Sequence, residues 1–438
     1  MVLNPKFKIQ NLKLQKLPPL LLSWFAREAR DLPWRRTRDP YAIWVSEIML
    51  QRTQVKTVIP YWERWMRELP TIESLAKASP DRIHKLWEGL GYYTRVRNMQ
   101  KAAVQIVECG VRSAESGRAK AVYKFPNEFE DVLALPGIGR YTAGAICSIA
   151  FNQPKPILDG NVIRVLTRVF GIGENPKEKM TNAQLWQIAE QLVSRAKNAK
   201  DSKRDMSLLA SRPSREIDAC SFLNQSLMEL GALICTPRNP QCLLCPVQKH
   251  CVALKEYRIE ELPNLGKRAG ATARHFMAFV VERDGKFLVR QRPPNVVNGH
   301  LWEFPNMEVG PRLSQPQRVN MEDHDRTSPS ISGKATRCGS GDPRSGQVGA
   351  LAKQLFGRSP AEANPLCTIK HSITRYRITL EAFHVHFEGR GSGKSKGLRQ
   401  GVLPSGIWLP ASEFDSLAFT AAHKKLASFA RKCILSGP

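Results

Sequence analysis

Long hydrophobic runs are missing from this 438-residue sequence. No stretch approaches the roughly 18 consecutive apolar residues of a membrane-spanning helix. The apolar segment 17–22 is too short for the hydrophobic part of a signal peptide, and it contains Pro18 and Pro19. These absences predict a soluble, intracellular protein with no membrane partner.

Acidic residues are scarce. The chain has 39 Asp and Glu against 66 Lys and Arg, so its formal net charge is +27. A charge of this size and sign favours a polyanionic partner, and nucleic acid is the usual one. Such binding would weaken with added salt, because contacts to phosphates release counterions. The alternative is a basic surface that binds nothing.

The evenly scattered cysteines of a secreted disulfide scaffold are also missing, since four of the ten cysteines lie together between residues 235 and 251. Thiolates suit zinc and iron–sulfur clusters alike. Zinc sites usually pair their cysteines as two close doublets, and here only Cys242 and Cys245 form one. The uneven distances to Cys235 and Cys251 favour an iron–sulfur cluster. Zinc and disulfides remain as alternatives.

Residues 20–255 show the periodicity of helices, with apolar residues three and four positions apart and without long strand-like alternation. Taking helices of about 12 residues plus loops, this length predicts roughly ten helices. The polar, aperiodic segment 196–219 is expected to be a loop inserted between two of them. We therefore expect a multidomain protein whose residues 1–255 form an all-α region.

The C-terminal third has a different character, with apolar runs typical of strands and turn residues between them. We expect a separate α/β domain over 273–438, preceded by a linker at 256–272. Segment 311–347 is predicted to be a disordered insertion, because it has too few apolar residues to bury. The predicted elements are strands at 275–281 and 287–289 joined by a turn at Asp284-Gly285, a strand pair around 376–387, and a helix at 421–433.

A glycine-rich turn stands out in the helical region, in the sequence Leu-Pro-Gly-Ile-Gly-Arg at 135–140. Gly137 and Gly139 allow the backbone to approach another molecule closely. Their N–H groups, together with the next helix N-terminus, can cradle an anion. This is helix–hairpin–helix chemistry, which holds a DNA phosphate without reading sequence. The alternative is an ordinary tight turn between packed helices.

Two carboxyl groups are candidates for acid and base work. Glu47 lies in an apolar run, where desolvation would favour its protonated form and suit a general acid. Asp159 precedes a predicted helix, whose N-terminus would favour its ionised form. Two carboxyls with separated pKa values are typical of glycosidic chemistry. The alternatives are a residue at the polar edge of a buried helix for Glu47 and a simple N-cap for Asp159.

These motifs together resemble the endonuclease III superfamily of DNA glycosylases. Further stretches resemble its adenine DNA glycosylase (MutY) branch, and Leu301–Pro305 (LWEFP) looks like the Nudix-like recognition domain of that branch. The resemblance covers nearly the whole chain except the two insertions. The further matching stretches are Leu32–Arg35 (LPWR), Ser46–Gln51 (SEIMLQ), Gly89–Tyr93 (GLGYY) and Met228–Ala232 (MELGA).

The resemblance implies a monofunctional glycosylase of base-excision repair. It would bind double-stranded DNA as a monomer and excise adenine paired with 8-oxoguanine or guanine, after flipping the adenine out of the helix. The four cysteines would hold a 4Fe-4S cluster. The protein would work beside the chromosome, in the cytoplasm or, in a eukaryote, in the nucleus or mitochondrion.

The resemblance also implies roles for single residues. Glu47 would protonate the adenine at N7, and Asp159 would stabilise the oxocarbenium-like sugar. Asn161 would orient this pair, and Tyr141 would lie beside the sugar. The residues expected to contact DNA or the bases are Arg35, Leu50, Gln51, Arg52, Tyr92, Tyr93, Gly137, Gly139, His371 and Ser372.

Several positions distinguish this chain from its relatives. Tyr141 stands where the bifunctional branch has a Schiff-base lysine, so β-lyase activity is expected to be weak or absent. Arg52 stands where a wedge glutamine is usual, and Ile369–Ser372 (IKHS) replaces the usual Phe-Ser-His. No REUxEExGU helix follows Glu303, so the C-terminal domain should bind rather than hydrolyse. The rival functions are a thymine glycosylase acting on T·G pairs and a non-catalytic mismatch-binding protein.

Overall fold

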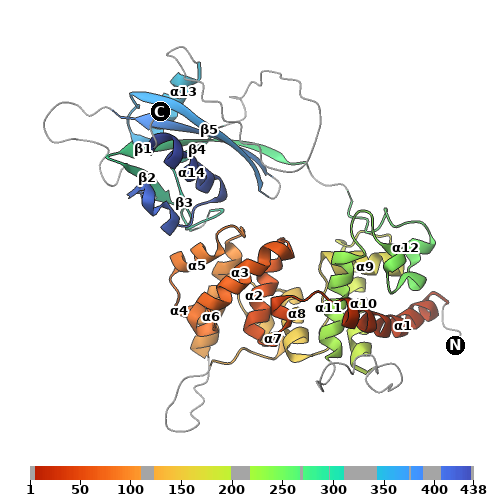
Figure 1. Ribbon diagram of the computed structural model, residues 1–438. Coiled ribbons are helices and arrows are strands. Elements are labelled where there is room, and N and C mark those ends of the chain that lie inside the picture. Colours follow the sequence, from red (N-terminus) through yellow and green to blue (C-terminus); the bar gives the residue numbers. More distant parts are fainter. Residues whose placement is uncertain are drawn as a thin grey trace, which may run out of the picture. The chain divides into compact units, whose positions relative to one another are not determined.

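The computed structural model describes residues 5–109, 123–198, 218–266, 270–294, 296–309, 343–373, 376–387 and 406–435 (Figure 1). The contacts divide the chain into two compact units. The first unit comprises residues 1–78 and 95–268, and the second comprises residues 79–94 and 269–438. Among the described helices, none combines the length and hydropathy needed to cross a bilayer.

The described part of residues 1–255 is helical, as the sequence predicts. Segment α5 belongs to the second unit by its contacts. The helices are α1 (Pro5–Glu28), η1 (Pro33–Arg35), α2 (Pro40–Leu50), α3 (Val55–Glu68), α4 (Ile72–Lys77), α5 (Pro80–Trp87), α6 (Thr94–Cys109), α7 (Phe129–Ala134), α8 (Arg140–Phe151), α9 (Gly160–Phe170), α10 (Lys179–Asn198), α11 (Ala219–Leu233), η4 (Cys242–Leu244), η5 (Gln248–His250) and α12 (Val252–Lys255).

Helix α1 begins at Pro5, well before the expected start of the helical pattern at Leu20, and it includes Pro18 and Pro19. A proline inside a helix removes a backbone hydrogen bond. The buried side chains of Leu14, Leu17, Leu21 and Phe25 recur along one face and compensate for this loss. They pack in one core with residues of α10 and α11.

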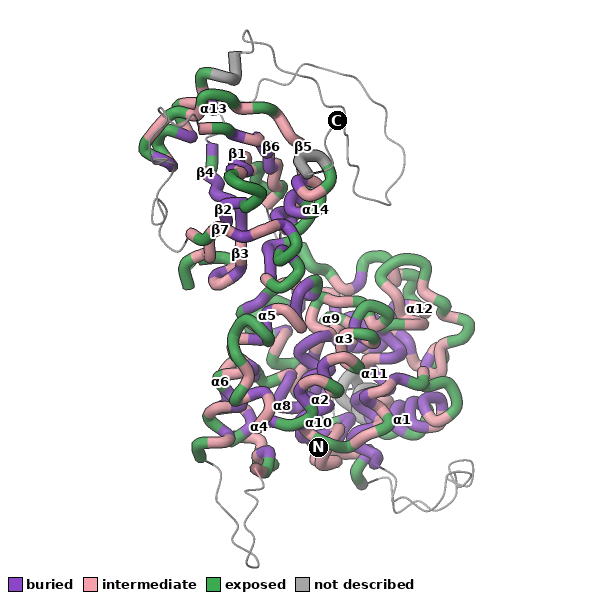
Figure 2. The backbone as a smooth tube through the Cα atoms, turned by 60° about the vertical axis from the view of Figure 1, so that its left-hand side comes forward, coloured by how far each residue is buried: buried purple, intermediate pink, exposed green. Residues whose placement is uncertain are grey.

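Helix α11 is the centre of the first unit, and it contacts α1, α8, α9 and α10. Most of its residues are buried (Figure 2). The loop predicted at 196–219 lies mostly outside the described residues, and its ends belong to α10 and α11. The C-terminal half of α11 and the residues directly after it, 225–235, contribute to both candidate sites described below.

The second unit contains a mixed sheet, in the order β3-β2-β1-β6-β5, with β4 also paired to β1 and β7 to β2. Strands β1 and β6 are parallel and the other pairs are antiparallel. The elements are β1 (Thr272–Arg283), β2 (Lys286–Gln291), β3 (Trp302–Glu303), β4 (Asn306–Val309), α13 (Pro343–Phe356), β5 (Glu362–Ile373), β6 (Tyr376–His386), β7 (Gly406–Pro410), η7 (Ala411–Ser416) and α14 (Ala421–Leu435).

Alternate residues of β1 face two separate cores. Met277 and Phe279 pack with residues of α13, and Ala278 and Val280 pack with residues of α14. This period of two is the pattern of a strand that is buried on both faces. The predicted hairpin turn is confirmed, because Asp284 and Gly285 both have positive φ, of 52° and 71°. The predicted last helix is present as α14, but segment 376–387, expected to be a strand pair, is the single strand β6, whose antiparallel partner β5 lies before it in the chain.

Two predicted boundaries need correction. Residues 343–347, which we assigned to the disordered insertion, belong to helix α13. The rest of that segment, 311–342, lies outside the described residues. Part of the predicted linker is packed, because Leu262 is 2% exposed and lies in a cluster with Cys251 and Ala253. Arg168 holds it there, since its Nε donates to the Leu262 carbonyl at 2.8 Å.

Candidate active site and cysteine cluster

Glu47 lies on α2 in a run where every residue from Tyr41 to Met49 is buried. Only 5% of Glu47 is exposed. Burial raises the pKa of its carboxyl to about 7; the Tyr141 hydroxyl opposes this shift and the Asp159 charge adds to it. The predicted desolvation is therefore confirmed. The carboxyl holds its proton in a large fraction of molecules at neutral pH, which is what a general acid needs.

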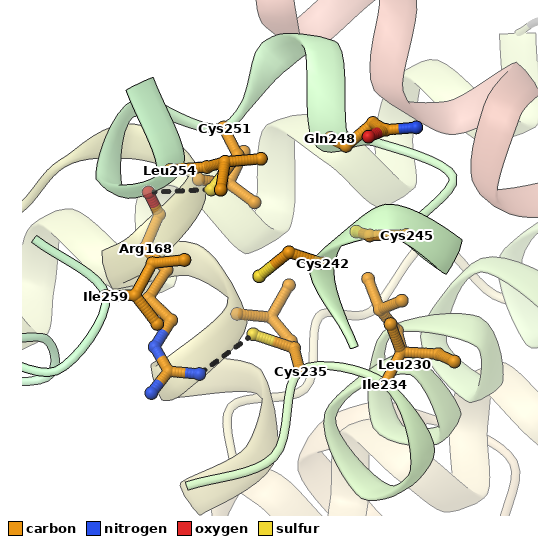
Figure 3. Close-up of a pocket in the computed structure, with 12 residues that line it drawn as sticks. Arg168, Leu230, Ile234, Cys235, Cys242, Cys245, Gln248, Cys251, Leu254 and Ile259 are labelled. Carbon is orange, nitrogen blue, oxygen red and sulfur yellow. Dashed lines mark hydrogen bonds between the residues drawn. The ribbon is translucent and has the colours of Figure 1, made fainter. Parts of the chain in front are cut away.

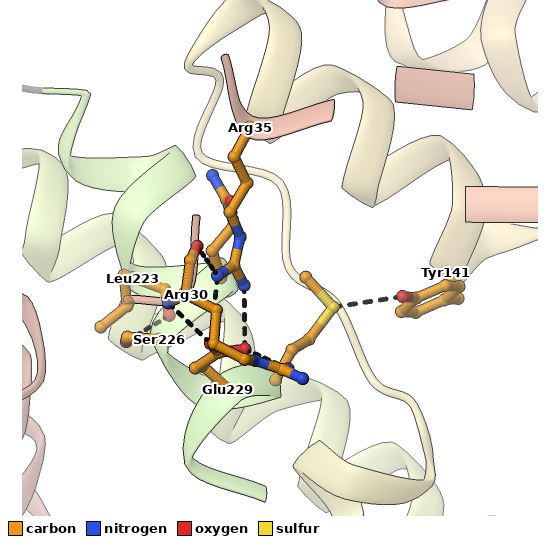
Figure 4. Close-up of polar contacts among 8 residues, drawn as sticks. Arg30, Arg35, Tyr141, Leu223, Ser226 and Glu229 are labelled. Atoms are coloured by element: carbon orange, nitrogen blue, oxygen red, sulfur yellow. Dashed lines mark hydrogen bonds and ion pairs between the residues drawn. The ribbon is translucent and has the colours of Figure 1, made fainter. Parts of the chain in front are cut away.

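Tyr141, at the start of α8, faces Glu47. Its hydroxyl donates a hydrogen bond of 2.8 Å to Glu47 Oε2. The same hydroxyl lies 3.2 Å from the sulfur of Met228, a contact drawn as a dashed line in Figure 4. Burial raises the pKa of Tyr141 well above its usual value, and the charges of Glu47 and Asp159 raise it further. The phenol therefore stays protonated and acts as a donor. Because Asp159 influences both residues, the three groups belong to one site.

Asp159 is the N-cap of α9. Its Oδ1 accepts a hydrogen bond of 2.7 Å from Val162 N, and Oδ2 accepts one of 3.1 Å from Asn161 Nδ2. The cap is as predicted, but the expected lowering of its pKa is wrong. Burial raises the pKa of Asp159 even though these donors oppose the shift. Desolvation outweighs the helix terminus here, which the sequence alone could not show.

Asn161 is fixed from two sides. Arg164 Nη2 donates to Asn161 Oδ1 at 2.8 Å and to the Gly231 carbonyl at 2.7 Å. A Cβ atom on Gly231 would lie 2.6 Å from Asn161 Cβ, so α11 can approach α9 this closely only with glycine at this position. Arg164 Nε also donates to the Cys235 carbonyl at 2.7 Å. The side chain beside Asp159 is thus tied to the first of the clustered cysteines.

Arg35 is held by a buried carboxylate that our sequence reasoning quoted only as part of a matching stretch. Glu229, 1% exposed, accepts hydrogen bonds from Arg35 at 3.0 and 3.1 Å and from Arg30 at 2.6 and 2.8 Å (Figure 4). Burial alone would raise the pKa of Glu229, but the two guanidinium groups lower this pKa to about 2. Gln225 also accepts from Arg35, at 3.1 Å. Such bidentate pairs fix the guanidinium plane.

Leu50 is the last residue of α2, and Gln51 and Arg52 begin the turn that follows it. Arg52 is exposed and has a φ of 59°, in the left-handed region that few side chains adopt. Arg95 supports the turn, because its Nη1 donates to the carbonyls of Ile48 at 2.7 Å and Gln51 at 2.6 Å. Arg95 thus caps the C-terminal end of α2, a role that the sequence did not reveal.

The glycine hairpin lies between α7 and α8. Gly137 has a φ of 79°, and a Cβ there would lie 2.6 Å from Asn98 Cβ. Gly139 is exposed at the N-cap of α8, and a Cβ there would meet nothing within 4 Å. The close packing explains the first glycine. The second leaves free space in front of the N-terminus of α8, where an anion could approach the backbone.

The two tyrosines predicted to stack near the DNA differ in exposure. Tyr92 is 42% exposed and has a φ of 49°, whereas Tyr93 is 6% exposed. The Tyr93 ring packs edge-on against His84, with centroids 5.8 Å apart. The buried ring of Tyr93 has little surface for a base, so Tyr92 is the better candidate for a contact.

The four cysteines of segment 235–251 line one cavity (Figure 3). The other lining residues are mostly apolar, and none carries a carboxylate. No three metal-ligating side chains of the described residues converge closely enough for a single ion. Arg168 Nη1 lies 3.4 Å from the sulfur of Cys235, so a guanidinium group stands beside one of the four sulfur atoms. The soft donors and the apolar cavity fit an iron–sulfur cluster.

His371 and Ser372 lie near the end of β5, opposite Ile378 and Arg377 of β6. His371 is half-buried, and burial together with the charge of Lys425 lowers its pKa. Within the described residues its Nδ1 is buried and has no hydrogen-bond partner. Ser372 is exposed. Helix α13 carries no acidic residue over its whole length, so it offers no carboxylate with which to bind magnesium as a Nudix helix does.

Comparisons with known proteins agree with this site. Residues 45–191 match the HhH-GPD superfamily of base excision DNA repair proteins, residues 235–251 match the iron-sulfur binding domain of endonuclease III, and residues 276–428 match the NUDIX domain. The match at 235–251 decides between zinc, disulfides and iron–sulfur in favour of the last.

Whole-length relatives carry the name adenine DNA glycosylase. The rat protein is 32% identical over 93% of this chain and 76% of its own length, and the mouse protein is 36% identical over the same shares. A solved structure of a thermostable thymine-DNA glycosylase is also similar, with 26% identity, a TM-score of 0.45, and coverage of 58% of this chain and 100% of its own. The chain therefore belongs to the adenine DNA glycosylase family, the base-excision repair enzymes that combine a helix–hairpin–helix glycosylase region, an iron–sulfur domain and a Nudix-like domain.

Proposed function

We propose that this glycosylase removes adenine paired with 8-oxoguanine or guanine in double-stranded DNA, by hydrolysis of the N-glycosidic bond and without cutting the strand. The observation that carries the proposal is the triad of Glu47, Tyr141 and Asp159, in which a buried carboxyl with a pKa of about 7 faces a protonated phenol beside a second carboxyl. The basic chain supplies the attraction to DNA.

Glu47 is the proposed general acid. Tyr141 donates to its Oε2, so the acidic proton resides on Oε1 and is available to N7 of a flipped adenine. Protonation at N7 turns the base into a neutral leaving group. Burial keeps this proton available at neutral pH, where an exposed glutamate would have lost it.

Asp159 is the proposed stabiliser of the positive charge that develops on the sugar as the base leaves. The donors Val162 N and Asn161 Nδ2 favour its ionised form and fix both oxygens. Arg164 in turn fixes Asn161. Water then completes the reaction and leaves an abasic site. Tyr141 has no amine, so it cannot form the imine that leads to strand cleavage.

Arg35 is proposed to contact the flipped adenine, because its guanidinium is held rigidly by Glu229 and Gln225 near the Tyr141 side chain (Figure 4). Leu50, Gln51 and Arg52 are proposed to wedge the duplex open from the turn that Arg95 supports. Gly137 and Gly139 are proposed to hold a backbone phosphate, and Tyr92 or Tyr93 to stack nearby.

The C-terminal unit is proposed to read the base opposite the adenine. His371 offers a buried ring nitrogen with no partner among the described residues, and Ser372 offers an exposed hydroxyl beside it. Both types of group can distinguish 8-oxoguanine from guanine by hydrogen bonds. A monomer that acts on chromosomal DNA, in the cytoplasm or in a eukaryotic nucleus or mitochondrion, is part of the same proposal.

The iron–sulfur cluster would be held by Cys235, Cys242, Cys245 and Cys251. When bound, it supplies four metal–thiolate bonds that close the loop segments between these residues. The chain itself contributes Arg168, which binds the carbonyls of Thr236 and Leu262 and orients the segment around Cys235.

A single-turnover excision assay on a panel of duplexes tests the proposed function. Adenine would be placed opposite 8-oxoguanine, guanine or thymine, and thymine opposite guanine, with products read before and after hot alkali. We expect adenine loss that is fastest opposite 8-oxoguanine, with strand breaks only after alkali. Thymine release from the T·G duplex alone would contradict the proposal, and breaks without alkali would contradict the role of Tyr141.

A further inference from the structure

The segment 79–94 groups by contact with the C-terminal unit, although its sequence lies inside the match to the glycosylase superfamily at 45–191. It contains α5 and the Gly89–Tyr93 turn. This segment of the glycosylase sequence therefore belongs, by its contacts, to the same compact unit as the Nudix-like sequence.

Glu88, the residue that follows α5, makes the main polar contacts of this surface. Its side chain is 7% exposed. Oε1 accepts a hydrogen bond of 3.3 Å from Phe419 N, and Oε2 accepts one of 2.6 Å from Lys424 Nζ. Oε2 also accepts from Lys85 Nζ at 2.9 Å, and this ammonium group donates to the Leu417 carbonyl at 3.2 Å.

Charge-assisted hydrogen bonds make up this contact. Glu88 lies just before the N-terminus of α14, where the helix dipole attracts negative charge, and two lysines balance it. A buried carboxylate with such partners is costly to remove, because its loss leaves Lys424 and the buried Phe419 N–H without their acceptor. The contact is thus a specific anchor and not an incidental surface pair.

A second contact supports the same region. The ring of His84 on α5 stacks on that of His300, with centroids 6.2 Å apart and an angle of 24° between the planes. Two residues later, Trp302 N donates to the Ala418 carbonyl and its own carbonyl accepts from Thr420 N. The backbone of β3 is thus hydrogen-bonded to the residues before α14. His84 contacts this pair on the β3 side, and Glu88 contacts it on the α14 side.

Helix α14 also sets the surroundings of the proposed lesion-reading histidine. The helix packs on β5, which carries His371, and Lys425 is the charge that acts on this histidine. The neighbouring His423 is buried and accepts a hydrogen bond from Phe304 N at 3.1 Å. A shift of the first turn of α14 would therefore alter both the core of the unit and the environment of His371.

We propose that Glu88 is a positioning residue that anchors segment 79–94 to the start of α14, and that this anchor sets the preference for 8-oxoguanine over guanine opposite the adenine. The anchor itself stands on the contacts above. Its effect on preference rests on the proposed function.

The test uses the full-length protein with Glu88→Ala, Glu88→Gln, Lys424→Met and the double variant Glu88→Ala/Lys424→Met, and with Glu73→Gln as the matched control. Glu73 forms an exposed ion pair with Lys77. Hydrogen exchange would be measured in peptides covering 82–90 and 417–426, and single-turnover excision would be measured on A·8-oxoguanine and A·G duplexes.

We expect Glu88→Ala to speed exchange in both peptides by about tenfold, because the buried anchor is lost, with no change in peptides of α9 or α11. The exchange rates of Glu88→Gln should lie between those of the parent and Glu88→Ala, because its amide oxygen can still accept from Phe419 N–H. The double variant Glu88→Ala/Lys424→Met should exchange little faster than Glu88→Ala alone, since both substitutions remove the same interaction. The ratio of the two excision rates should fall about fivefold, with the A·G rate within about twofold of the parent.

Unchanged exchange at 417–426 in Glu88→Ala would overturn the anchor. Faster exchange with an equal loss of both excision rates would overturn its role in preference, because that pattern marks a merely structural residue. If the parent protein itself shows no preference for 8-oxoguanine, the proposed function fails on that point, and the exchange result alone decides whether Glu88 is the anchor.

Discussion

The hydroxyl of Tyr141 donates a hydrogen bond of 2.8 Å to Oε2 of Glu47. This bond joins two residues that are 94 positions apart in the chain, on α8 and α2. This bond stabilises the ionised form of Glu47 and so lowers its pKa. Burial raises the pKa by more, and the carboxyl reaches a pKa of about 7. The proposed acid is thus tuned by the balance of one hydrogen bond against desolvation.

Replacing Tyr141 by phenylalanine removes that bond and keeps the ring. Because the hydroxyl lowers the pKa of Glu47, its loss should raise this pKa above about 7. A general acid works only while protonated, so the rate falls as pH rises through its pKa. The falling limb of the single-turnover pH–rate profile should therefore move to higher pH in Tyr141→Phe. A limb that stays in place or moves to lower pH would show that Tyr141 does not tune this acid.

Replacing Glu47 by glutamine should change how stability depends on pH. Its folded pKa is about 7, raised from 4.5, so its contribution is full below about pH 4.5 and is lost as pH rises through 7. Glu47→Gln removes that loss and should be more stable than the parent at pH 8.5 by up to about 3 kcal/mol, with little gain at pH 4.5.

Denaturant unfolding at the two pH values measures this difference. Glu73→Gln, which changes an exposed glutamate in the same way, is the control and should show no such gain. If Glu47→Gln and the parent respond to pH alike, the carboxyl is not desolvated as described.

Gly231→Ala should impair the chemical step. The added Cβ would lie 2.6 Å from Asn161 Cβ, so Asn161 must shift and can no longer fix Asp159. We expect an excision rate at least about tenfold lower, with duplex affinity nearly unchanged. Gly349→Ala on α13 is the control, because its Cβ would meet nothing within 4 Å. Parent-like excision by Gly231→Ala would mean that the position of Asn161 is unimportant.

Removal of iron should weaken both fold and DNA binding. The four cysteines line the cavity beside Arg168, and this segment is otherwise short in regular structure. Loss of metal–thiolate bonds should lower the Tm and reduce affinity for a non-cleavable duplex. The measurement is thermal unfolding and binding of the protein before and after oxidative loss of iron. Equal duplex affinity of the two forms would contradict a role of the cluster in DNA binding.

Local patterns explain what the sequence could predict. The hairpin around Gly137, the turn at Asp284-Gly285 and the cysteine spacing each depend on neighbours in the chain, so they were readable. Partners far apart were not. Nothing near Glu229 indicates that it holds an arginine 199 positions away, and nothing near Glu88 indicates a lysine 336 positions away.

Burial was the other missing quantity. The sequence placed Asp159 correctly at a helix N-terminus, yet the direction of its pKa shift was wrong, because desolvation depends on residues brought together only by the fold. For Glu47 the apolar run of its own helix gave the correct direction. The helical pattern was expected only from residue 20, whereas α1 begins at Pro5, since its tertiary packing outweighs the cost of Pro18 and Pro19.

The most direct test of the central claim is single-turnover excision by Asp159→Asn on the A·8-oxoguanine duplex, measured together with affinity for that duplex. Asparagine keeps the shape of the side chain and removes the charge that would stabilise the sugar. The account predicts a loss of excision rate of at least about 100-fold, with lesion binding within a few-fold of the parent. Excision at the parent rate would contradict it.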